Sequence, residues 1–373
     1  MSWLLLLITG AYALFTLILW YTWRQMPRPA PLPDLTGGPL VTVIVPVRNE
    51  AAGIGALLSD LARQTYPHYE VIIADDASTD DTRAIVAEAA SRAPYPLHLL
   101  ALTDERTASP KKRAITQSIV RASGTLIVTT DGDCRVGPDW LAALVQQYRQ
   151  TGARLLSGPV TFTEARTLTD QLQTVEFASL IGSGAVTMAL GWPTMCNGAN
   201  LCYEKAVFAE VGGFAGVDHL ASGDDELLMH KIARRHPQGV RFVSDPAAVV
   251  QTVPHRSWSA FYQQRKRWAS KWRAYESYGP SVLAVFIFLS NLAPVVAGLG
   301  WWLTSLNGMT FFLVVAGKVV PEALFLRRVL VFLQKKPAVW YIPLTQLVYP
   351  LYVLFFGLVA QGKGYRWKGR KLE

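Results

Sequence analysis

The sequence contains few cysteines, and their spacing excludes a disulfide framework. Only three occur in 373 residues, Cys134, Cys196 and Cys202, and none of them forms a CxxC pair. Small domains stapled by disulfides carry an even and closely spaced set of cysteines. We therefore expect these three to be packing residues of a protein that faces a reducing, cytoplasmic compartment.

Charged residues are also scarce, and they are unevenly distributed. They make up 17% of the chain, against 51% hydrophobic residues, and the mean hydropathy is +0.21. The net charge is +9, and Lys and Arg gather around positions 256–273, 327–336 and 363–371, beside apolar segments. This pattern suits an anionic leaflet and phosphate groups, and it argues against nucleic acid as a partner. It predicts a membrane protein with one soluble domain of about 220 residues.

The N-terminus lacks the features of a cleaved signal peptide. Residues 3–23 form an uncharged, largely apolar run with no Lys or Arg before it and no small-residue cleavage site after it. A run of this length spans a bilayer, so the sequence predicts a retained anchor. Arg24 and Arg28 follow it, and the positive-inside rule then places residue 24 onward in the cytoplasm, at the inner membrane if the source is a bacterium.

Three further apolar segments, at about 281–304, 309–326 and 339–360, are expected near the C-terminus. Lys318 and Glu322 are four residues apart in the second segment and are expected to pair there. Three full crossings would place the basic tail outside, against the positive-inside rule. Pro343 and Pro350 make the last segment the candidate for a bent or re-entrant one.

Strand-like and helix-like segments alternate in the soluble part. Expected strands are Leu40–Val47, Glu70–Ala74, His98–Leu102 and Thr125–Thr130, and expected helices cover residues 50–64 and about 80–92, the second capped by Ser78 or Thr79. This order predicts a βαβ arrangement with polar residues at the carboxyl ends of parallel strands. The first strand ends in Pro46-Val47-Arg48-Asn49-Glu50 and not in a GxGxxG turn, which argues against a nicotinamide-dependent oxidoreductase.

Three acidic sites and one basic motif stand out in this frame. The acidic sites are Asp75-Asp76, Asp131-Gly132-Asp133 and Asp224-Asp225, and the basic motif is the pentad Gln264-Arg265-Lys266-Arg267-Trp268. Together with the segments Val43–Glu50 and Ile72–Asp80, they resemble family 2 glycosyltransferases of the GT-A fold. The membrane-integrated members are the most similar, and they include ceramide glucosyltransferases and cellulose, chitin and hyaluronan synthases. The resemblance implies a Rossmann-like α/β GT-A domain between N- and C-terminal transmembrane helices.

The resemblance also implies a binding site for a nucleotide-sugar donor. Asp76 would accept hydrogen bonds from the base or ribose, in a pocket shaped by Glu50 and Pro46, and Lys111 and Lys112 would reach the diphosphate. Asp131 and Asp133 would hold Mg²⁺ or Mn²⁺, because two carboxylates two residues apart at a strand end can meet one hard cation. The alternatives are structural: an Asx turn at Asp75-Asp76, a solvated charge run at the lysines and a surface turn at Asp131-Gly132-Asp133.

The remaining motifs are assigned to transfer and to the acceptor. Within Asp224-Asp225, Asp225 would be the general base of an inverting displacement, although the pair would also suit a helix N-terminus as charge alone. By resemblance, Asn197 and Asn200 would bind acceptor hydroxyls, unless they only build a turn. Arg265 and Arg267 would face the diphosphate, Trp268 would stack on the acceptor and Gln264 would hydrogen-bond nearby. The alternative for this helix is an interfacial anchor without chemistry.

The predicted organisation is an anchor (1–24), a proline-rich linker (25–39), a GT-A catalytic domain (40–255), an amphipathic interfacial helix (256–279), a C-terminal membrane region (280–362) and a basic tail (363–373). The expected function is transfer of a sugar from a nucleotide donor, favoured to be a UDP-sugar, to a lipid at the membrane. A processive polysaccharide synthase and an inactive membrane scaffold are the two alternatives.

Overall fold

The computed structural model of the chain describes residues 2–27, 35, 37–103, 107–269, 279–359, 365–367 and 370–372. The chain divides into two compact units, each with its own interior. The helical unit comprises Met1–Met26, Glu164–Val186 and Pro254–Tyr365, and the sheet unit comprises Pro27–Thr163, Thr187–Val253 and Arg366–Glu373. Glu164–Val186 thus groups with the apolar helices, although the predicted catalytic domain of residues 40–255 includes it.

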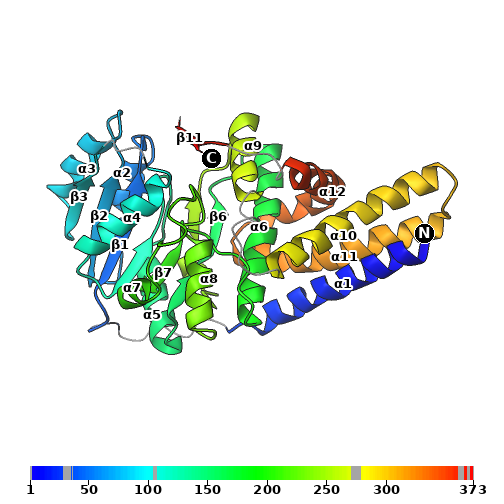
Figure 1. The fold of residues 1–373 in the computed structure, drawn as a ribbon, viewed down its shortest axis with the longest axis horizontal. Helices are drawn as coiled ribbons and strands as arrows, with labels where there is room; N and C mark the ends of the chain where they lie inside the picture. Colours follow the sequence, from blue (N-terminus) through cyan, green and yellow to red (C-terminus); the bar gives the residue numbers. More distant parts are fainter. Residues whose placement is uncertain are drawn as a thin grey trace. The chain divides into compact units, whose positions relative to one another are not determined.

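A seven-stranded sheet forms the core of the sheet unit (Figure 1), in the order β3-β2-β1-β4-β7-β5-β8. Its strands are β1 Val41–Val47, β2 Tyr69–Asp75, β3 Leu97–Ala101, β4 Leu126–Thr129, β5 Leu155–Ser157, β7 Leu201–Glu204 and β8 Val240–Phe242. Strands β1 to β4 run parallel, β7 is antiparallel to β4 and β5, and β8 is parallel to β5. The four strands predicted from the sequence are therefore confirmed to within one residue at each end. They form the parallel half of the sheet.

The helices of the sheet unit are α2 Ile54–Leu61, α3 Thr82–Ala90, α4 Pro110–Arg121, α5 Trp140–Thr151, α7 Lys205–Glu210 and α8 Glu226–Arg235. Strands β6 Val160–Phe162 and β9 Val250–Thr252 pair as a small parallel sheet, and Pro246–Ala248 forms a 3₁₀ turn. The predicted cap of α3 is wrong, because the helix begins after Asp81. Ser78 and Thr79 instead bind Asn49 in the loop after β1: the Asn49 N–H donates to Ser78 Oγ at 2.9 Å, and the Thr79 N–H donates to Asn49 Oδ1 at 2.8 Å.

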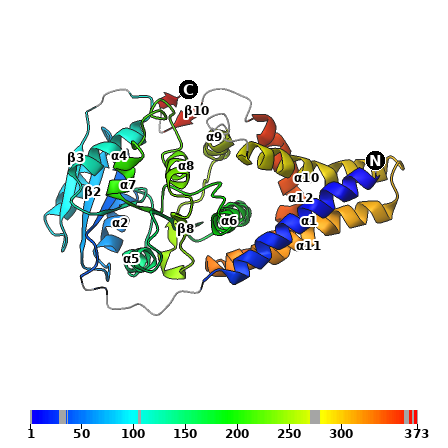
Figure 2. The ribbon, with the colours of Figure 1, turned by 60° about the horizontal axis from the view of Figure 1, so that its bottom comes forward.

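The helical unit consists of α1 Ser2–Gln25, α6 Leu168–Ala189, α9 Trp258–Ala269, α10 Gly279–Trp302, α11 Gly308–Phe332, the 3₁₀ turn Lys336–Tyr341 and α12 Ile342–Val359. Four helical segments among the described residues are long and apolar enough to cross a membrane: Ser2–Gln25, Ser281–Trp302, Gly308–Phe332 and Lys336–Val359. Helices α1, α10 and α11 lie side by side (Figure 2). The four apolar segments expected from the sequence are confirmed as helices.

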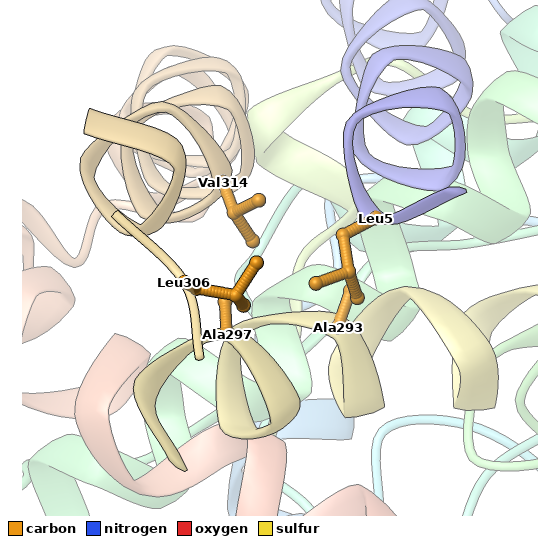
Figure 3. Close-up of a cluster of buried hydrophobic side chains, with 5 residues drawn as sticks. All are labelled: Leu5, Ala293, Ala297, Leu306 and Val314. Atoms are coloured by element: carbon orange, nitrogen blue, oxygen red, sulfur yellow. The ribbon is translucent and has the colours of Figure 1, made fainter. Parts of the chain in front are cut away.

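An apolar cluster shows how three of these helices run. Leu5 of α1 packs with Ala293 and Ala297 of α10, with Leu306 of the loop after α10 and with Val314 in the first half of α11 (Figure 3). Near the other end of α1, the Trp23 ring lies 6.3 Å from Phe325 and 5.3 Å from Phe332 of α11. Helices α1 and α11 therefore run in the same direction, and α10 runs opposite to both.

A polar cluster lies in the interior of the same bundle. The Lys318 ammonium donates to Glu322 Oε1 at 2.8 Å, so the pair predicted within this segment is confirmed. It also donates to Gln346 Oε1 of α12 at 3.2 Å, and the Tyr12 hydroxyl of α1 donates to Glu322 Oε1. The cluster thus joins three helices with complementary charges and hydrogen bonds, as buried ionisable groups in apolar surroundings require.

The last apolar helix, α12, packs largely on α9 and α10. Phe356 lies 6.1 Å from the Phe261 ring of α9, and the Gly357 Cα stands close to the Phe288 ring of α10. Phe288 belongs to the first half of α10, near the level of the contact between Phe286 and Tyr12. The C-terminal end of α12 therefore stays beside the half of the bundle where α10 begins. In the tail, β10 Tyr365–Trp367 pairs with β11 Arg370–Leu372, and Lys368 lies outside the described residues.

Candidate functional site

The loops after β1 and β2 form one edge of the site. Because β1 pairs with β2 in parallel, with Val47 opposite Asp75, both strands deliver their following residues to the same end of the sheet. Asn49 and Ala77 adopt the left-handed conformation, with φ of 53° and 54°. A non-glycine residue in this region costs about 1 kcal/mol or more and is kept only where surrounding contacts hold it. Here the hydrogen bonds between Asn49 and residues 78 and 79 hold the two loops together.

Asp75 and Asp76 have separate roles. Asp75 is fully buried; its Oδ2 accepts from the Ser78 N–H at 3.2 Å and from Arg83, so it builds the turn. The Asp76 carboxylate is held by Arg113 at 2.8 Å and lies 3.8 Å from Arg48. Two guanidinium groups therefore orient the side chain expected to bind the nucleoside. Sequence reasoning did not single out these arginines, and nothing in their local pattern separates them from solvated charges.

The Asp131-Gly132-Asp133 turn follows β4 and approaches the loop after β1 closely. A Cβ on Gly132 would lie 2.8 Å from Val47 Cγ1 and 3.0 Å from Glu50 Cγ, so only glycine allows this approach. The Glu50 side chain therefore packs beside the turn. The Glu50 N–H donates to Thr82 Oγ1 at 2.8 Å. The Thr252 hydroxyl donates to Asp133 Oδ2 at 3.3 Å. The turn is thus built with its two carboxylates at the carboxyl end of the parallel strands.

Lys111 joins two of the acidic motifs. Its ammonium donates to Asp131 Oδ1 at 2.7 Å and lies 3.2 Å from Asp224 Oδ2. Burial alone would lower the pKa of Lys111, but the charges of Asp131 and Asp224 outweigh it and raise the pKa, so the side chain stays charged. Asp131 and Asp224, which lie about a hundred residues apart in the sequence, therefore both contact the Lys111 ammonium.

Lys112 has a different environment from the one expected for it. Its ammonium is almost fully buried and donates to the carbonyl oxygens of Val217, Leu220 and Ser222 at 2.6, 2.8 and 3.0 Å. These three bonds use the donors that a diphosphate would need. The expected diphosphate contact of Lys112 is therefore corrected to a structural role: the side chain holds the loop that leads into Asp224-Asp225.

Asp225 caps helix α8 and also reaches the loop at residues 196–200. One carboxylate oxygen accepts from the Glu226 N–H at 2.7 Å, and the other accepts from the Gly198 N–H at 3.0 Å. The structural role considered for this pair, a helix N-terminus, is therefore present. The two N–H bonds also give the Asp225 carboxylate a defined orientation. Gly198 itself is held by Thr129 at the end of β4, whose hydroxyl donates to the Gly198 carbonyl at 2.9 Å.

The two asparagines of this loop differ in how fully the fold already uses their side-chain amides. Asn200 is fully buried, donates to the carbonyls of Pro159 and Ala248 at 2.8 Å each and accepts from Trp140 Nε1 at 3.0 Å. The acceptor contact expected for Asn200 is therefore wrong, because its amide is already used inside the fold. Asn197 is partly exposed, and its Oδ1 accepts from the Ala199 N–H at 3.0 Å within the turn. An acceptor contact for Asn197 stays a prediction.

The pentad lies on α9, in the helical unit. Arg265 is buried and donates to Glu176 of α6 and, at 2.6 Å, to Gln264 Oε1. The Trp268 ring stacks on Phe177 of α6 at a centroid distance of 5.9 Å. Burial lowers the pKa of His255, which hydrogen-bonds Gln264, so this imidazole is neutral at physiological pH. The predicted helix ran to residue 279, but residues 270–278 lie outside the described part of the chain.

The donor set fits a divalent cation bound together with a nucleotide. Within the described residues, no group of three or more His, Cys, Asp or Glu side chains is arranged to hold a metal. Mg²⁺ is commonly bound through one or two carboxylates plus substrate phosphates, so Asp131 and Asp133 satisfy the protein's share of such a site. Gly132 supports this fit, because its missing side chain keeps the turn tight against Val47 and Glu50.

Comparison with known proteins supplies the family. The chain is 33% identical over 189 residues to the glycosyltransferase AglE of Haloferax volcanii, a match that covers 50% of this chain and 59% of that protein. It is 23% identical over 236 residues to the poly-beta-1,6-N-acetyl-D-glucosamine synthase of Staphylococcus aureus, covering 61% of this chain and 53% of that protein. The chain thus spans little more than half the length of these curated relatives.

A solved structure shares the fold. The mannosyltransferase PcManGT from Pyrobaculum calidifontis, in complex with GDP-Man and Mn²⁺, matches with a TM-score of 0.59 and 23% identity, over 93% of this chain and 99% of that one. The family model for glycosyl transferase family 21 matches residues 1–373. The likeness to membrane-integrated GT-A enzymes expected from the motifs is thereby confirmed. The chain belongs to glycosyl transferase family 21 and has a GT-A-type α/β fold and helices able to span a membrane.

Proposed function

We propose that the protein transfers one sugar, with inversion, from a nucleotide-sugar donor to a lipid acceptor at the membrane surface. The observation that carries this proposal is the Lys111 ammonium between Asp131 and Asp224, at 2.7 and 3.2 Å. It gathers the expected metal ligand and the expected base motif at the carboxyl end of the parallel strands. Open α/β sheets bind nucleotides at this edge.

The donor is held at the ends of β1, β2 and β4. Asp76, oriented by Arg113 and Arg48, accepts hydrogen bonds from the base or ribose, while Pro46 and Glu50 line the pocket. Lys111 carries the positive charge toward the diphosphate, because its contact with Asp131 can be exchanged for a phosphate oxygen while Asp224 holds it in place. A divalent cation on Asp131 and Asp133 would offset the charge that develops on the leaving nucleoside diphosphate.

Asp225 takes the proton from the acceptor hydroxyl. The N–H groups of Gly198 and Glu226 each bind one carboxylate oxygen, at 3.0 and 2.7 Å, so the base is oriented before the acceptor arrives. One base without a nucleophilic carboxylate partner suits a single displacement. In this scheme Asp224 stays paired with Lys111 and keeps that lysine near the diphosphate.

A lipid acceptor is favoured by the small membrane region. Three C-terminal apolar helices leave little material for a polymer channel within one chain. A processive synthase remains the second candidate, and the similarity to the Staphylococcus aureus synthase supports it. The two candidates differ in product length, because a single transfer yields a one-sugar glycolipid and a synthase yields a ladder of polymer.

We further infer that the N-terminus lies outside, that the sheet unit faces the cytoplasm and that α12 is re-entrant. Arg24, Arg327, Arg328 and Lys336 are exposed at the ends of α1 and α11, which lie on the same side of the bundle. The positive-inside rule assigns that side to the cytoplasm. Because α12 returns to α9 and the first half of α10, a re-entrant helix keeps the basic tail on the cytoplasmic side as well.

The decisive experiment incubates membranes that contain the full chain with a panel of radiolabelled UDP- and GDP-sugars and Mn²⁺, followed by lipid extraction and sizing of the product. We expect one labelled donor to yield a single lipid-soluble species. A ladder of products would replace the proposal with a processive synthase. No turnover of any donor, with a matched active enzyme as the positive control, would favour the inactive scaffold.

A further inference from the structure

Arg265 lies at the centre of a buried cluster. It is 3% exposed, and its two terminal nitrogens donate to Glu176 Oε2 and to Gln264 Oε1. Its guanidinium also lies over two rings of its own helix, 4.7 Å from the centroid of Phe261 and 4.3 Å from that of Trp268. A guanidinium in this setting is held by charge, hydrogen bonds and stacking together, and it has little freedom to reach another ligand.

Glu176 connects this arginine to the last membrane helix. The side chain is 8% exposed, and its second oxygen, Oε1, accepts from the Tyr352 hydroxyl of α12 at 3.0 Å. One buried carboxylate on α6 therefore binds α9 through Arg265 and α12 through Tyr352. A buried carboxylate needs such partners, because an unpaired charge away from water is costly.

Aromatic contacts surround the cluster and fix the same three helices. Phe261 of α9 lies 6.2 Å from Tyr352 and 6.1 Å from Phe356 of α12, while Trp268 stacks on Phe177 of α6. These contacts orient the face of α9 that carries residues 261, 265 and 268.

We propose that Glu176, Arg265 and Tyr352 form a clamp that positions α9 for sugar transfer. Arg265 is then a positioning residue, which revises the diphosphate contact expected for it from the motif. This inference rests on the proposed function, because it assumes that α9 takes part in transfer. It adds that activity depends on α12, because Tyr352 of that helix binds the Glu176 carboxylate.

The experiment uses the full chain in lipid nanodiscs and two single variants, Glu176→Gln and Tyr352→Phe. Glu176→Gln keeps the shape of the side chain but leaves Arg265 without a counter-charge, and Tyr352→Phe removes one hydroxyl. Tyr262→Phe is the matched control, because it removes a tyrosine hydroxyl from the same aromatic contact without touching Glu176. Initial rates, the binding of UDP and GDP, and hydrogen exchange of residues 258–269 are measured for each.

We expect Glu176→Gln to lower kcat at least about tenfold, Tyr352→Phe to lower it severalfold, and both to leave nucleotide binding within about twofold of the wild type. Hydrogen exchange of residues 258–269 should accelerate in Glu176→Gln and Tyr352→Phe but not in Tyr262→Phe. Wild-type kcat in Glu176→Gln would overturn the clamp.

A double variant separates positioning from stability. Glu176→Gln with Arg265→Gln removes both buried charges together, so folded protein should recover to the wild-type level. If the clamp positions α9, kcat stays low in the double variant; recovery of kcat to within about twofold would reduce the cluster to a stability element. The exchange measurement is independent of turnover. A chain that transfers no sugar but loses protection of α9 in Glu176→Gln would therefore contradict the proposed function and keep the physical clamp.

Discussion

Two lysines, one in each unit of the chain, are both held by carboxylates but differ in how completely they are enclosed. Lys318, in the helical unit, is 2% exposed and is bonded to Glu322 and Gln346, with the rings of Tyr12 and Tyr349 at 5.6 and 5.7 Å. The Lys111 side chain, in the sheet unit, is 21% exposed, and the Asp131 carboxylate that it contacts is 38% exposed. The first cluster is closed, whereas the second is open to solvent.

This difference separates charges that hold the fold from charges that meet a ligand. A closed cluster in apolar surroundings has its donors and acceptors matched internally, so it fixes how helices pack. An open cluster can exchange a carboxylate contact for a phosphate or a cation at little cost. Variants of the open cluster should therefore lose activity more than stability, and variants of closed clusters should do the reverse.

The largest expected effect belongs to Asp225, at the edge of the open cluster. Asp225→Asn cannot accept the proton of the acceptor hydroxyl, so transfer should fall by roughly 10²–10⁴ while the affinity for the donor nucleotide stays nearly intact. Steady-state rates and nucleotide binding of the full chain check this. If affinity and rate fall together, Asp225 belongs to the donor site and the assignment as base fails.

The next effect concerns the turn after β4. Asp131→Ala and Asp133→Ala each remove one carboxylate from the cation site, and the rate should fall on the order of a hundredfold or more. Chelation of divalent cations should abolish turnover of the wild type, and added Mn²⁺ or Mg²⁺ should restore it. Full activity in EDTA would contradict the metal assignment for both residues.

A matched pair of substitutions tests the comparison directly. Lys111→Met should lower the rate at least about tenfold, equivalent to about 1.4 kcal/mol, with little change in unfolding, because solvent cations can replace the ammonium. Lys318→Met leaves Glu322 without its cation inside the bundle and should destabilise the chain by about 3–5 kcal/mol.

Unfolding in mixed micelles and donor turnover are measured for both variants. Adding Glu322→Gln to Lys318→Met should restore much of the lost stability, because the unpaired charge disappears. A Lys318→Met variant as stable as the wild type would break the distinction between closed and open clusters.

The parallel half of the fold could be predicted because long apolar strands have a clear sequence pattern. β1 and β2 have seven residues each, almost all of them buried, and β4 ends two residues before Asp131. Strands β5, β6, β8 and β9 have three residues each, too short for any periodicity to mark them. The antiparallel strand β7 depends on pairing with β4 and β5, which is a tertiary contact.

The candidate site was predicted by residue type but not by bonding. The motifs singled out Asp131 and Asp224, which both contact Lys111 in the structure, yet they also assigned ligand roles to Lys112 and Asn200, which the fold uses internally. The side chains of Lys112 and Asn200 donate to backbone carbonyls that are distant in the sequence. No local sequence pattern indicates such contacts. For the same reason Arg265 looked equivalent to Arg267 until its contact with Glu176 was seen.

The smallest expected effect concerns a buried carboxylate of the sheet unit whose arginine partners reach solvent. Asp60 is 2% exposed and accepts from Arg63, from Arg135 Nε at 2.5 Å and Nη2 at 2.9 Å, and from the Val136 N–H at 3.3 Å. Burial acts to raise the pKa of Asp60, but the bonds from Arg135 and Val136 outweigh it and hold the pKa below its ordinary value of 3.8. The charged form is therefore the one that stabilises the fold. Its contribution is complete above about pH 4 and is lost as the pH falls through the depressed pKa.

Asp60→Asn should cost about 1–3 kcal/mol at neutral pH, because the arginines lose their charged acceptor. Catalysis should be unchanged at temperatures where the variant is folded. Hydrogen exchange of residues 134–140, corrected for the intrinsic pH dependence, is the local measurement. In the wild type we expect protection of this segment to decline as the pH drops below about 4, and in Asp60→Asn we expect lower protection that is nearly independent of pH in that range. A variant whose protection follows the wild-type pH profile would show that this carboxylate does not stabilise the segment through its charge.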